Sequence, residues 1–431
     1  MSAATQRFAK IAARRAAGER SGIASVCSAH PLVIEATLRH GAARGGDVLI
    51  EATCNQVNHE GGYTGMTPAG FRRFVETSAE NAGFSFDNLI LGGDHLGPNP
   101  WKHMAAATAM KNAAVMIDAY ASAGFTKIHL DTSMACADDP AVLADETIAA
   151  RAAELAAVAE AATKRHGGER PVYVIGTEVP VPGGALEALD HLHVTEPDDA
   201  PRTVELHRQA FSRAGLDAAF ARAVGVVVQP GVEFGNTEIV PYAPEKARAL
   251  AATLDRMPQF VFEAHSTDYQ SAQALNALVH DGFAILKVGP WLTFALREAL
   301  YGLSHIADIL VSDPARESLP AAMERLMMEA PENWLKYYPG RPGEQHLQRH
   351  FSLSDRIRYY WPAPQAQTAV RALLAVLGDV NIPRPLISQY FGHLDAAVAD
   401  GQVPPRAADL LIASIIRVLD IYDNATSGCN S

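Results

Sequence analysis

The chain has 431 residues, of which 48% are apolar and only 7% aromatic. This length and apolar content allow a large buried core, either in one big domain or in a domain with an appendage. The net charge of −12 and the isoelectric point near 5.7 exclude the basic face that a nucleic acid or an anionic membrane would require. We therefore expect a small metabolite as the partner, with no nucleic acid and no membrane.

The cysteine pattern indicates a reducing compartment. The four cysteines lie far apart without CxxC spacing, which argues against a zinc knuckle and against a disulfide framework. They are Cys27, Cys54, Cys136 and Cys429. No apolar run approaches the roughly 20 residues that span a bilayer, and residues 1–19 lack the apolar core of a secretory signal. We expect a cytoplasmic protein.

In chain order, an amphipathic helix is expected first, because Phe8, Ile11 and Ala12 share helical spacing. Apolar segments then alternate regularly with helical ones such as 31–40, 67–82, 104–122 and 140–165. The predicted strands are 23–27, 48–53, a run that begins at 88 and is broken by Gly97-Pro98, 127–131, 172–177, 224–228, 259–262 and 284–288. Eight strand and helix units predict an α/β fold of the (β/α)8 TIM-barrel type. A doubly wound open sheet is the alternative, but neither GxGxxG nor GxxxxGK is present.

Past about residue 312 the alternation stops, so we predict a barrel over 1–311 and a helical extension over 312–431. Apolar residues recur at helical spacing over 370–377 and over 386–398. Residues 411–421 are apolar on most sides, which predicts burial against the barrel or against another subunit of a homo-oligomer. The aromatic clusters 334–338 and 359–361 suggest core packing, with a lid over the barrel mouth as the alternative.

The stretch from Gly92 to Pro98 has the features of a strand that ends in a reactive site. Two glycines precede the adjacent Asp94 and His95, and Gly97 and Pro98 then interrupt the strand. In a barrel of this type the carboxyl ends of the strands share one face, where the chemistry takes place. Polar residues at or near these ends are Glu51, Asp94, His95, Lys102, His129, Asp131, Glu178, Glu263, His265 and Lys287.

Several of these residues suggest a metal site. His129 and Asp131 lie two positions apart on a strand, so their side chains leave on the same face, as do those of Glu263 and His265. A catalytic zinc takes about three nitrogen or oxygen ligands and keeps one position open, and a set of His95, Glu178 and His265 could supply them. His129 is a further candidate, magnesium or manganese is possible, and Glu178 could instead pair with a loop lysine.

Long specific stretches carry a resemblance to a known family. They are Val26–Pro31, Glu51–Asn58, Gly61–Met66, Gly92–Trp101, His129–Met134, Glu263–Tyr269 and Lys287–Thr293. Through them the chain resembles the Z-type subunits of tagatose-bisphosphate aldolase (GatZ/KbaZ), within the wider class II aldolase barrels, over essentially its whole length.

The resemblance implies roles for individual residues. Asp94 would be the proton-transferring group and His95 a metal ligand, and Glu178 before Gly183-Gly184 would be an acid of the metal site. The catalytic candidates are Asp94, Glu178 and Asp131, and the metal candidates are His95, Glu178, His265 and His129. The substrate-binding candidates are Glu51, Asn55, Lys102, Ser133, Ser266, Thr267, Lys287 and Gly289. Of these, Ser266, Thr267 and Gly289 are partial substitutes for the glycine-serine phosphate cradle of the class II aldolases.

The chain also departs from class II aldolases. Gln229-Pro230-Gly231 stands where those enzymes have a metal-binding histidine, and Glu263-Ala264 replaces a His-Gly pair. The resemblance therefore implies a divalent metal, zinc first, in an altered shell.

We expect a metal-dependent enzyme of tagatose 6-phosphate and tagatose 1,6-bisphosphate metabolism. Its aldolase-like chemistry would break C3–C4 and epimerise C4, converting tagatose 6-phosphate to fructose 6-phosphate. The alternative is a non-catalytic subunit that stabilises a separate class II tagatose-bisphosphate aldolase. A tagatose-6-phosphate kinase, as some relatives are named, ranks last because the sequence lacks a nucleotide-phosphate cradle.

Overall fold

The computed structural model describes residues 3–177, 192–311 and 316–427. Eight parallel strands close into a barrel in the order β1-β10-β9-β6-β5-β4-β3-β2, which confirms the predicted fold class. The barrel strands are β1 (Ile23–Val26), β2 (Val48–Thr53), β3 (Leu89–Leu96), β4 (Lys127–Leu130), β5 (Val172–Ile175), β6 (Ala223–Val228), β9 (Val261–Ala264) and β10 (Ile285–Val288).

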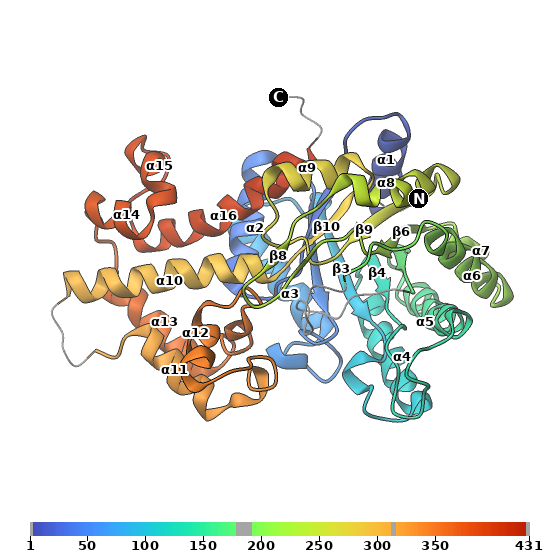
Figure 1. The fold of residues 1–431 in the computed structure, drawn as a ribbon, viewed down its shortest axis with the longest axis horizontal. Helices are drawn as coiled ribbons and strands as arrows, with labels where there is room; N and C mark the ends of the chain where they lie inside the picture. Colours follow the sequence, from blue (N-terminus) through green and yellow to red (C-terminus); the bar gives the residue numbers. More distant parts are fainter. Residues whose placement is uncertain (1–2, 178–191, 312–315, 428–431) are drawn as a thin grey trace.

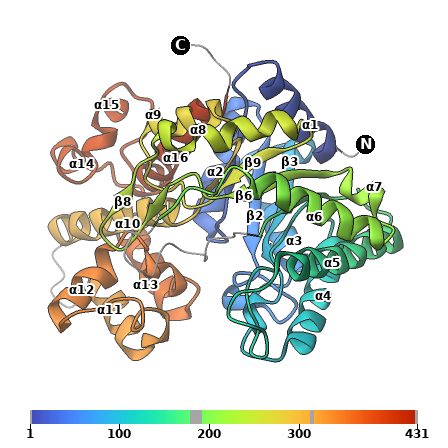
Figure 2. The same ribbon diagram turned by 45° about the vertical axis from the view of Figure 1, so that its right-hand side comes forward.

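Helices surround the barrel (Figures 1 and 2). They are α2 (Pro31–Arg44), α3 (Pro68–Ala82), α4 (Ala106–Ser122), α5 (Asp145–His166), α6 (Asp199–Arg213), α7 (Asp217–Phe220), α8 (Pro244–Ala252), α9 (Ala272–His280) and α10 (Pro290–Leu310). Two short strands, β7 (Glu233–Phe234) and β8 (Ile239–Val240), pair antiparallel outside the barrel. Several helices begin where their sequence predicts: Thr67 Oγ1 accepts a hydrogen bond from Gly70 N ahead of Pro68 in α3.

The predicted N-terminal helix is α1 (Ala3–Ala16), and it covers the amino-terminal end of the barrel. Phe8 is 1% exposed and packs in one cluster with Ile11 and with the first inward residues of the strands. These strand residues include Ile23, Leu49, Ile90, Val172, Val224, Val261 and Ile285. The next inward position on each strand lies two residues on, so the interior is apolar beside α1 and becomes polar toward the carboxyl ends.

The third strand ends just before Gly97 and Pro98, as predicted. β3 continues to Leu96, and its pairing with β4 shifts register between Gly93 and Leu96. His95 adopts φ 50° there, in the left-handed region that non-glycine residues seldom occupy. This irregularity lets the neighbouring side chains of Asp94 and His95 reach the same cavity, which a regular strand would prevent.

The glycine after this strand also has a defined role. A Cβ on Gly97 would lie 1.6 Å from the Asp131 carbonyl oxygen. Only glycine therefore lets the chain leave β3 so close to the end of β4.

The extension lies to one side of the barrel, at the left in Figure 1. Its helices are α11 (Leu319–Glu329), α12 (Pro342–Phe351), α13 (Pro364–Leu377), α14 (Arg384–Tyr390), α15 (Asp395–Ala399) and α16 (Ala407–Thr426). The apolar segment 411–421 lies in α16, which packs on α10 and returns to α2 and α9 of the barrel. Of the two expectations for this segment, burial against the barrel is therefore the one observed.

The helical pattern over 386–398 is interrupted by a 3₁₀ turn at Gly392–Leu394, because Gly392 disfavours a continuous helix. In the aromatic clusters, Trp334, Tyr338, Tyr360 and Trp361 are buried, as core packing predicts. Tyr359 and Trp361 also line the cavity at the barrel mouth, so the second cluster serves both purposes.

None of the described helices has the length and apolar character that a membrane span requires.

We expect Phe8→Ala to lower the free energy of unfolding by about 3–5 kcal/mol, because it leaves a void between α1 and the barrel floor. Lys10→Ala on the exposed face of the same helix is the control and should change it by less than about 0.5 kcal/mol. Urea unfolding followed by circular dichroism would measure both. Equal midpoints for the two variants would contradict the role of α1 as the floor of the barrel.

Candidate active site

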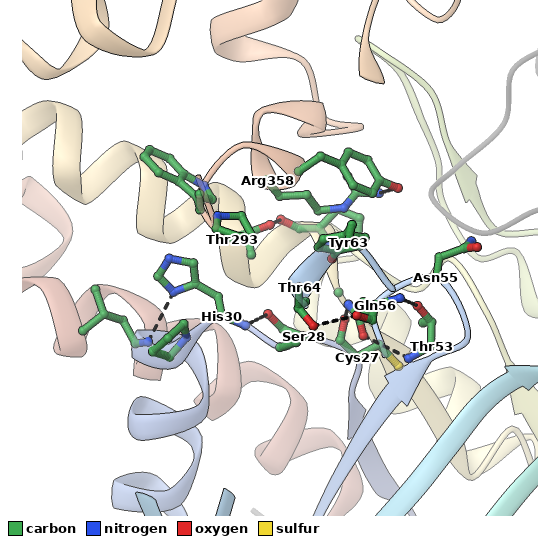
Figure 3. A pocket seen from close by; sticks show the side chains of 18 of the residues that line it. Cys27, Ser28, His30, Thr53, Asn55, Gln56, Tyr63, Thr64, Thr293 and Arg358 are labelled. Carbon is green, nitrogen blue, oxygen red and sulfur yellow. Dashed lines mark hydrogen bonds between the residues drawn. The ribbon is translucent and has the colours of Figure 1, made fainter. Parts of the chain in front are cut away.

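A cavity of about 570 Å³ lies at the carboxyl end of the barrel, between the strand ends and the extension. Its walls on the barrel side include Cys27, Thr53, Asp94, His265 and Lys287. Figure 3 shows the part of this cavity near Cys27, Thr53 and His30, with Arg358 of the extension reaching in from the other side. The location agrees with the general rule that barrels of this type carry their sites at the strand carboxyl ends.

Asp94 is the carboxylate around which the cavity is built. Its Oδ1 lies 2.8 Å from Lys287 Nζ and 2.9 Å from His129 Nδ1, and Cys27 Sγ donates to its Oδ2 at 3.7 Å. Burial alone would raise the pKa of Asp94, but His95, Lys287 and His129 together hold it well below its ordinary value. Asp94 is therefore an ionised carboxylate at neutral pH, at the wall of a cavity.

Beneath Asp94 the barrel interior holds a network of ion pairs. Lys127 Nζ lies 2.7 Å from Glu51 Oε1 and 2.7 Å from Glu263 Oε2, and all three side chains are completely buried. Lys287 Nζ links this network to Asp94, since it lies 3.2 Å from Glu51 Oε1 and 3.6 Å from Glu263 Oε1. Buried charges are tolerated only when they are paired in this way.

Three histidine rings meet beside the network. The ring centroids of His95, His129 and His265 lie 4.9 to 5.4 Å from one another. His95 Nδ1 lies 2.8 Å from Asp131 Oδ2, and His265 Nε2 lies 3.0 Å from Glu263 Oε1. Each of these two imidazoles thus has one nitrogen held by a carboxylate, an arrangement that orients histidines toward a metal in many proteins.

The donor atoms fit a divalent metal. Asp94, His129, Glu263 and His265 offer ligand atoms that all lie within 4.8 Å of one another. His129 Nε2 is buried and has no hydrogen-bond partner among the described residues. Burial lowers the pKa of His265 to about 4, so its imidazole is neutral as a metal requires. The network also carries more negative than positive side chains, since Asp94, Glu51 and Glu263 face only the ammonium groups of Lys127 and Lys287. His129 and His265 belong to the predicted metal set, whereas Asp94 and Glu263 were not predicted as ligands.

The other predicted residues occupy different positions. Asn55, Ser266 and Gly289 line the cavity, together with Asp94, His95, His265 and Lys287. Glu51, His129 and Asp131 lie buried behind its wall.

Besides Glu51, three more substrate-binding candidates do not line the cavity. Ser133 Oγ donates to Asp131 Oδ1 at 2.8 Å, and Thr267 Oγ1 donates to the Lys287 carbonyl oxygen at 2.6 Å. Lys102 is exposed beyond the 3₁₀ helix Asn99–Trp101. Glu178 lies outside the described residues.

Sequence reasoning missed three residues of this region. The sequence could indicate that Lys127 points inward, because it lies two residues before His129 on the same strand. It could not indicate that Glu51 of β2 and Glu263 of β9 would be its partners. Cys27 follows β1 and gave no signal beyond its place at a strand end. Arg358 comes from the extension, and no local pattern indicated that it would reach the barrel mouth.

The extension closes one side of the cavity with Arg358, Tyr359 and Trp361. Arg358 belongs to the 3₁₀ helix η7 (Arg356–Tyr359), and its guanidinium lies 4.5 Å from the centre of the Tyr359 ring. The ring of Trp361 meets His30 edge-on at 6.3 Å. Aromatic side chains of the extension therefore cover the strand ends.

The sequence model of the D-tagatose-1,6-bisphosphate aldolase subunit GatZ/KbaZ-like family matches residues 8–427. The chain belongs to this family. A curated relative, the D-tagatose 6-phosphate 4-epimerase of Agrobacterium fabrum (strain C58 / ATCC 33970), is 53% identical over 416 residues, which cover 96% of this chain and 97% of the relative.

A solved structure is equally similar. The crystal structure described as a probable tagatose 6 phosphate kinase from Sinorhizobium meliloti 1021 is 54% identical, with a TM-score of 0.88. The match covers 95% of this chain and 100% of that one. Members of the family thus carry the names of three different activities, and the site of this chain has to be interpreted from its own residues.

We expect Lys127→Met to lower the free energy of unfolding by about 3–5 kcal/mol, because Glu51 and Glu263 lose the ammonium group between them. Lys111→Met on the exposed surface of α4 is the matched control and should stay within about 0.5 kcal/mol. Urea denaturation measures both. An unchanged midpoint for Lys127→Met would contradict this role, because it would mean that other groups balance the negative charges of Glu51 and Glu263.

Proposed function

We propose that this protein interconverts tagatose 6-phosphate and fructose 6-phosphate by inverting C4 through retro-aldol cleavage and re-addition. The single observation that carries the proposal is the ionised Asp94 carboxylate at the wall of a sugar-sized cavity, beside Lys287 and three imidazoles. The 53% identity to a D-tagatose 6-phosphate 4-epimerase over nearly the whole chain supports it.

Asp94 would take the proton of the C4 hydroxyl group as a general base. The C3–C4 bond then breaks, its electron pair moves toward C2 as an enediolate, and C4 becomes an aldehyde. When the aldehyde turns and C3 attacks its other face, the bond re-forms with inverted configuration, and Asp94 returns the proton to the C4 oxygen. All atoms are conserved, and no oxidant or second substrate is needed.

Lys287 would assist by its charge. Its ammonium group lies 2.8 Å from Asp94, and Asp94 foremost among its acidic neighbours raises the pKa of Lys287 well above its ordinary value despite burial. It stays protonated in every step and keeps Asp94 ionised between turnovers. A base held ionised in this way is ready for each new substrate.

We propose zinc as the metal, with manganese or magnesium as alternatives, because two imidazoles and one carboxylate with an open position suit zinc best. His129, His265 and Glu263 would hold it, with His95 close by, while Asp94 stays free to act as the base. When bound, a divalent metal supplies Lewis-acid polarisation of the substrate carbonyl and stabilises the negative charge that develops there.

An epimerase must keep both fragments until the bond re-forms. Tyr359, Trp361 and Pro362 of the extension line the cavity opposite the strand ends. Such a wall limits the escape of the aldehyde, which favours re-addition over release. This enclosure supports an epimerase in preference to an aldolase that liberates its products.

A second candidate is the accessory role that the family description implies, in which the chain stabilises a separate aldolase subunit. The buried network argues against a purely structural site, because even well-paired buried ions seldom stabilise a scaffold more than apolar side chains of similar volume would. The two functions differ in one respect that is simple to measure, namely whether the chain acts alone.

We expect the purified chain with added zinc to convert tagatose 6-phosphate to fructose 6-phosphate, and Asp94→Asn to lower kcat by about 10²–10⁴-fold. Asp87→Asn, the same change at an exposed position just before β3, should leave kcat within about twofold. Chromatographic separation of the two ketose phosphates would follow the reaction. If the wild-type chain forms no fructose 6-phosphate with any of the three metals, the epimerase proposal is wrong.

We expect the wild-type chain to retain about one zinc ion after dialysis, and His129→Gln combined with His265→Gln to weaken zinc binding by at least about tenfold. His280→Gln, at an exposed histidine, controls for surface binding. Elemental analysis and calorimetric titration measure metal directly, without reference to activity. Equal zinc content in all three proteins would contradict the proposed ligands.

A further inference from the structure

We propose that the phosphate group of the substrate binds Arg358, so that the helical extension supplies the anion-binding half of the active site. The choice of a ketose 6-phosphate as ligand rests on the proposed function. The site itself follows from the charges that line the cavity and from the contacts that each of them already makes.

The usual place for a phosphate in such a barrel is already filled by a carboxylate. Phosphate sites in these folds are commonly formed by the loops after the seventh and eighth strands and by a helix N-terminus. Here Asp268 Oδ1 accepts hydrogen bonds from Gly289 N at 2.9 Å and from Trp291 N at 2.8 Å, at the start of α10. A phosphate at this position would lose these donors and would face a negative charge.

Asp268 is well fixed in this role. It is 3% exposed, and burial raises its pKa to about 6, so the carboxylate is still mostly ionised at pH 7. The residues predicted as partial substitutes for a phosphate cradle therefore offer little to an anion: Gly289 N is bound by Asp268, and the Thr267 hydroxyl donates to the Lys287 carbonyl oxygen.

The remaining cations can be compared directly. Among the described residues that line the cavity, the lysine and arginine side chains are Lys287, Arg358 and Arg371. Lys287 lies within 3.6 Å of three carboxylates, those of Asp94, Glu51 and Glu263, which neutralise it. Arg371 is exposed on α13, where water and salt screen its charge.

Arg358 differs from both. Its guanidinium donates to the carbonyl oxygens of Ser354 and Asp355 and, at 3.1 Å, to Tyr359 Oη. It forms no ion pair with a carboxylate in the described part of the chain. These neutral acceptors fix the side chain in place. The carboxylates of Asp268 and Asp355 interact with its charge only from beyond ion-pair distance, so the guanidinium is less fully compensated than Lys287 when an anion arrives.

The surroundings of Arg358 strengthen its attraction for phosphate. The ring of Tyr359 lies against the guanidinium, and Tyr63 meets Tyr359 edge-on at 4.9 Å. A charge beside aromatic rings in a cavity acts through a lower dielectric than one in bulk water. The planar fork of N–H groups also matches the oxygens of a phosphate, which a single ammonium group cannot do.

The position of Arg358 suits a substrate that reacts at one end and is charged at the other. In a ketose 6-phosphate the phosphate lies two carbons beyond C4. Cys27 marks the reactive end, since its Sγ lies 3.7 Å from Asp94 Oδ2, and Figure 3 shows Arg358 and Cys27 on different sides of the same cavity. The sugar would therefore extend from the strand ends toward η7.

The test is calorimetric titration of fructose 6-phosphate into the zinc-loaded full chain and its variants. Arg358→Gln should raise Kd by about 10- to 100-fold, the loss expected for a charge-assisted contact with phosphate. Arg358→Lys should recover part of the affinity, because it keeps the charge but not the fork. Arg325→Gln, on the exposed surface of α11, is the matched control and should bind within about twofold of wild type.

Two further measurements make the outcome unambiguous. Unphosphorylated fructose should bind wild type and Arg358→Gln equally weakly, and thermal unfolding should show that the variants are folded. Should Arg358→Gln fail to fold, Arg358→Lys and Tyr359→Phe are each compared with wild type instead. The first removes the guanidinium fork and the second removes a hydroxyl group that holds it, while both keep the positive charge. Each variant should raise Kd severalfold.

The proposal is overturned if Arg358→Gln binds fructose 6-phosphate as tightly as wild type, or if Arg371→Gln loses the affinity instead. The titration reports affinity, and separate product analysis reports turnover. Arg358-dependent binding in a chain that does not epimerise would therefore reject the proposed function and leave the phosphate site standing.

Discussion

The structure depends on the compensation of charges inside the barrel. Lys127 lies between Glu51 and Glu263, and Lys287 connects both acids to Asp94. In a medium of low dielectric none of these groups could remain charged alone. The apolar cluster formed by α1 and the strand starts excludes water from below. Water is therefore excluded from the network on the side of α1. On the opposite side the network borders the cavity, and Asp94 is its carboxylate that lines this cavity.

The extension has a second part in this arrangement. A TIM barrel is open at its carboxyl end, and here the opening is covered by side chains of η7 and α13. The long helix α10 leaves the barrel and α16 returns beside it, so the buried core continues from the barrel into the extension. Residues far apart in the chain thus line one cavity. Walls on two sides of this cavity favour chemistry in which the fragments of a cleaved intermediate are rejoined.

The names carried by relatives describe an aldolase subunit, a kinase and an epimerase. The geometry of this chain favours the last. An ionised general base, a set of donors that fits a divalent metal, and a second wall opposite the strand ends are features that inversion by retro-aldol chemistry would use. Kinase chemistry requires a cradle for nucleotide phosphates, and the sequence contains no glycine-rich loop of that kind.

The sequence by itself determined the barrel, because eight apolar segments at regular spacing have few other ways to be buried. It also indicated that Asp94, His95, His129 and His265 belong near one another, since each follows or ends a strand. The tertiary structure decided what they do there. The left-handed backbone at His95, the position of Lys127 between acids of two other strands, and the approach of Arg358 depend on contacts between distant segments. Local periodicity contains no information about such contacts, because it records which face a side chain takes and not which partner it meets.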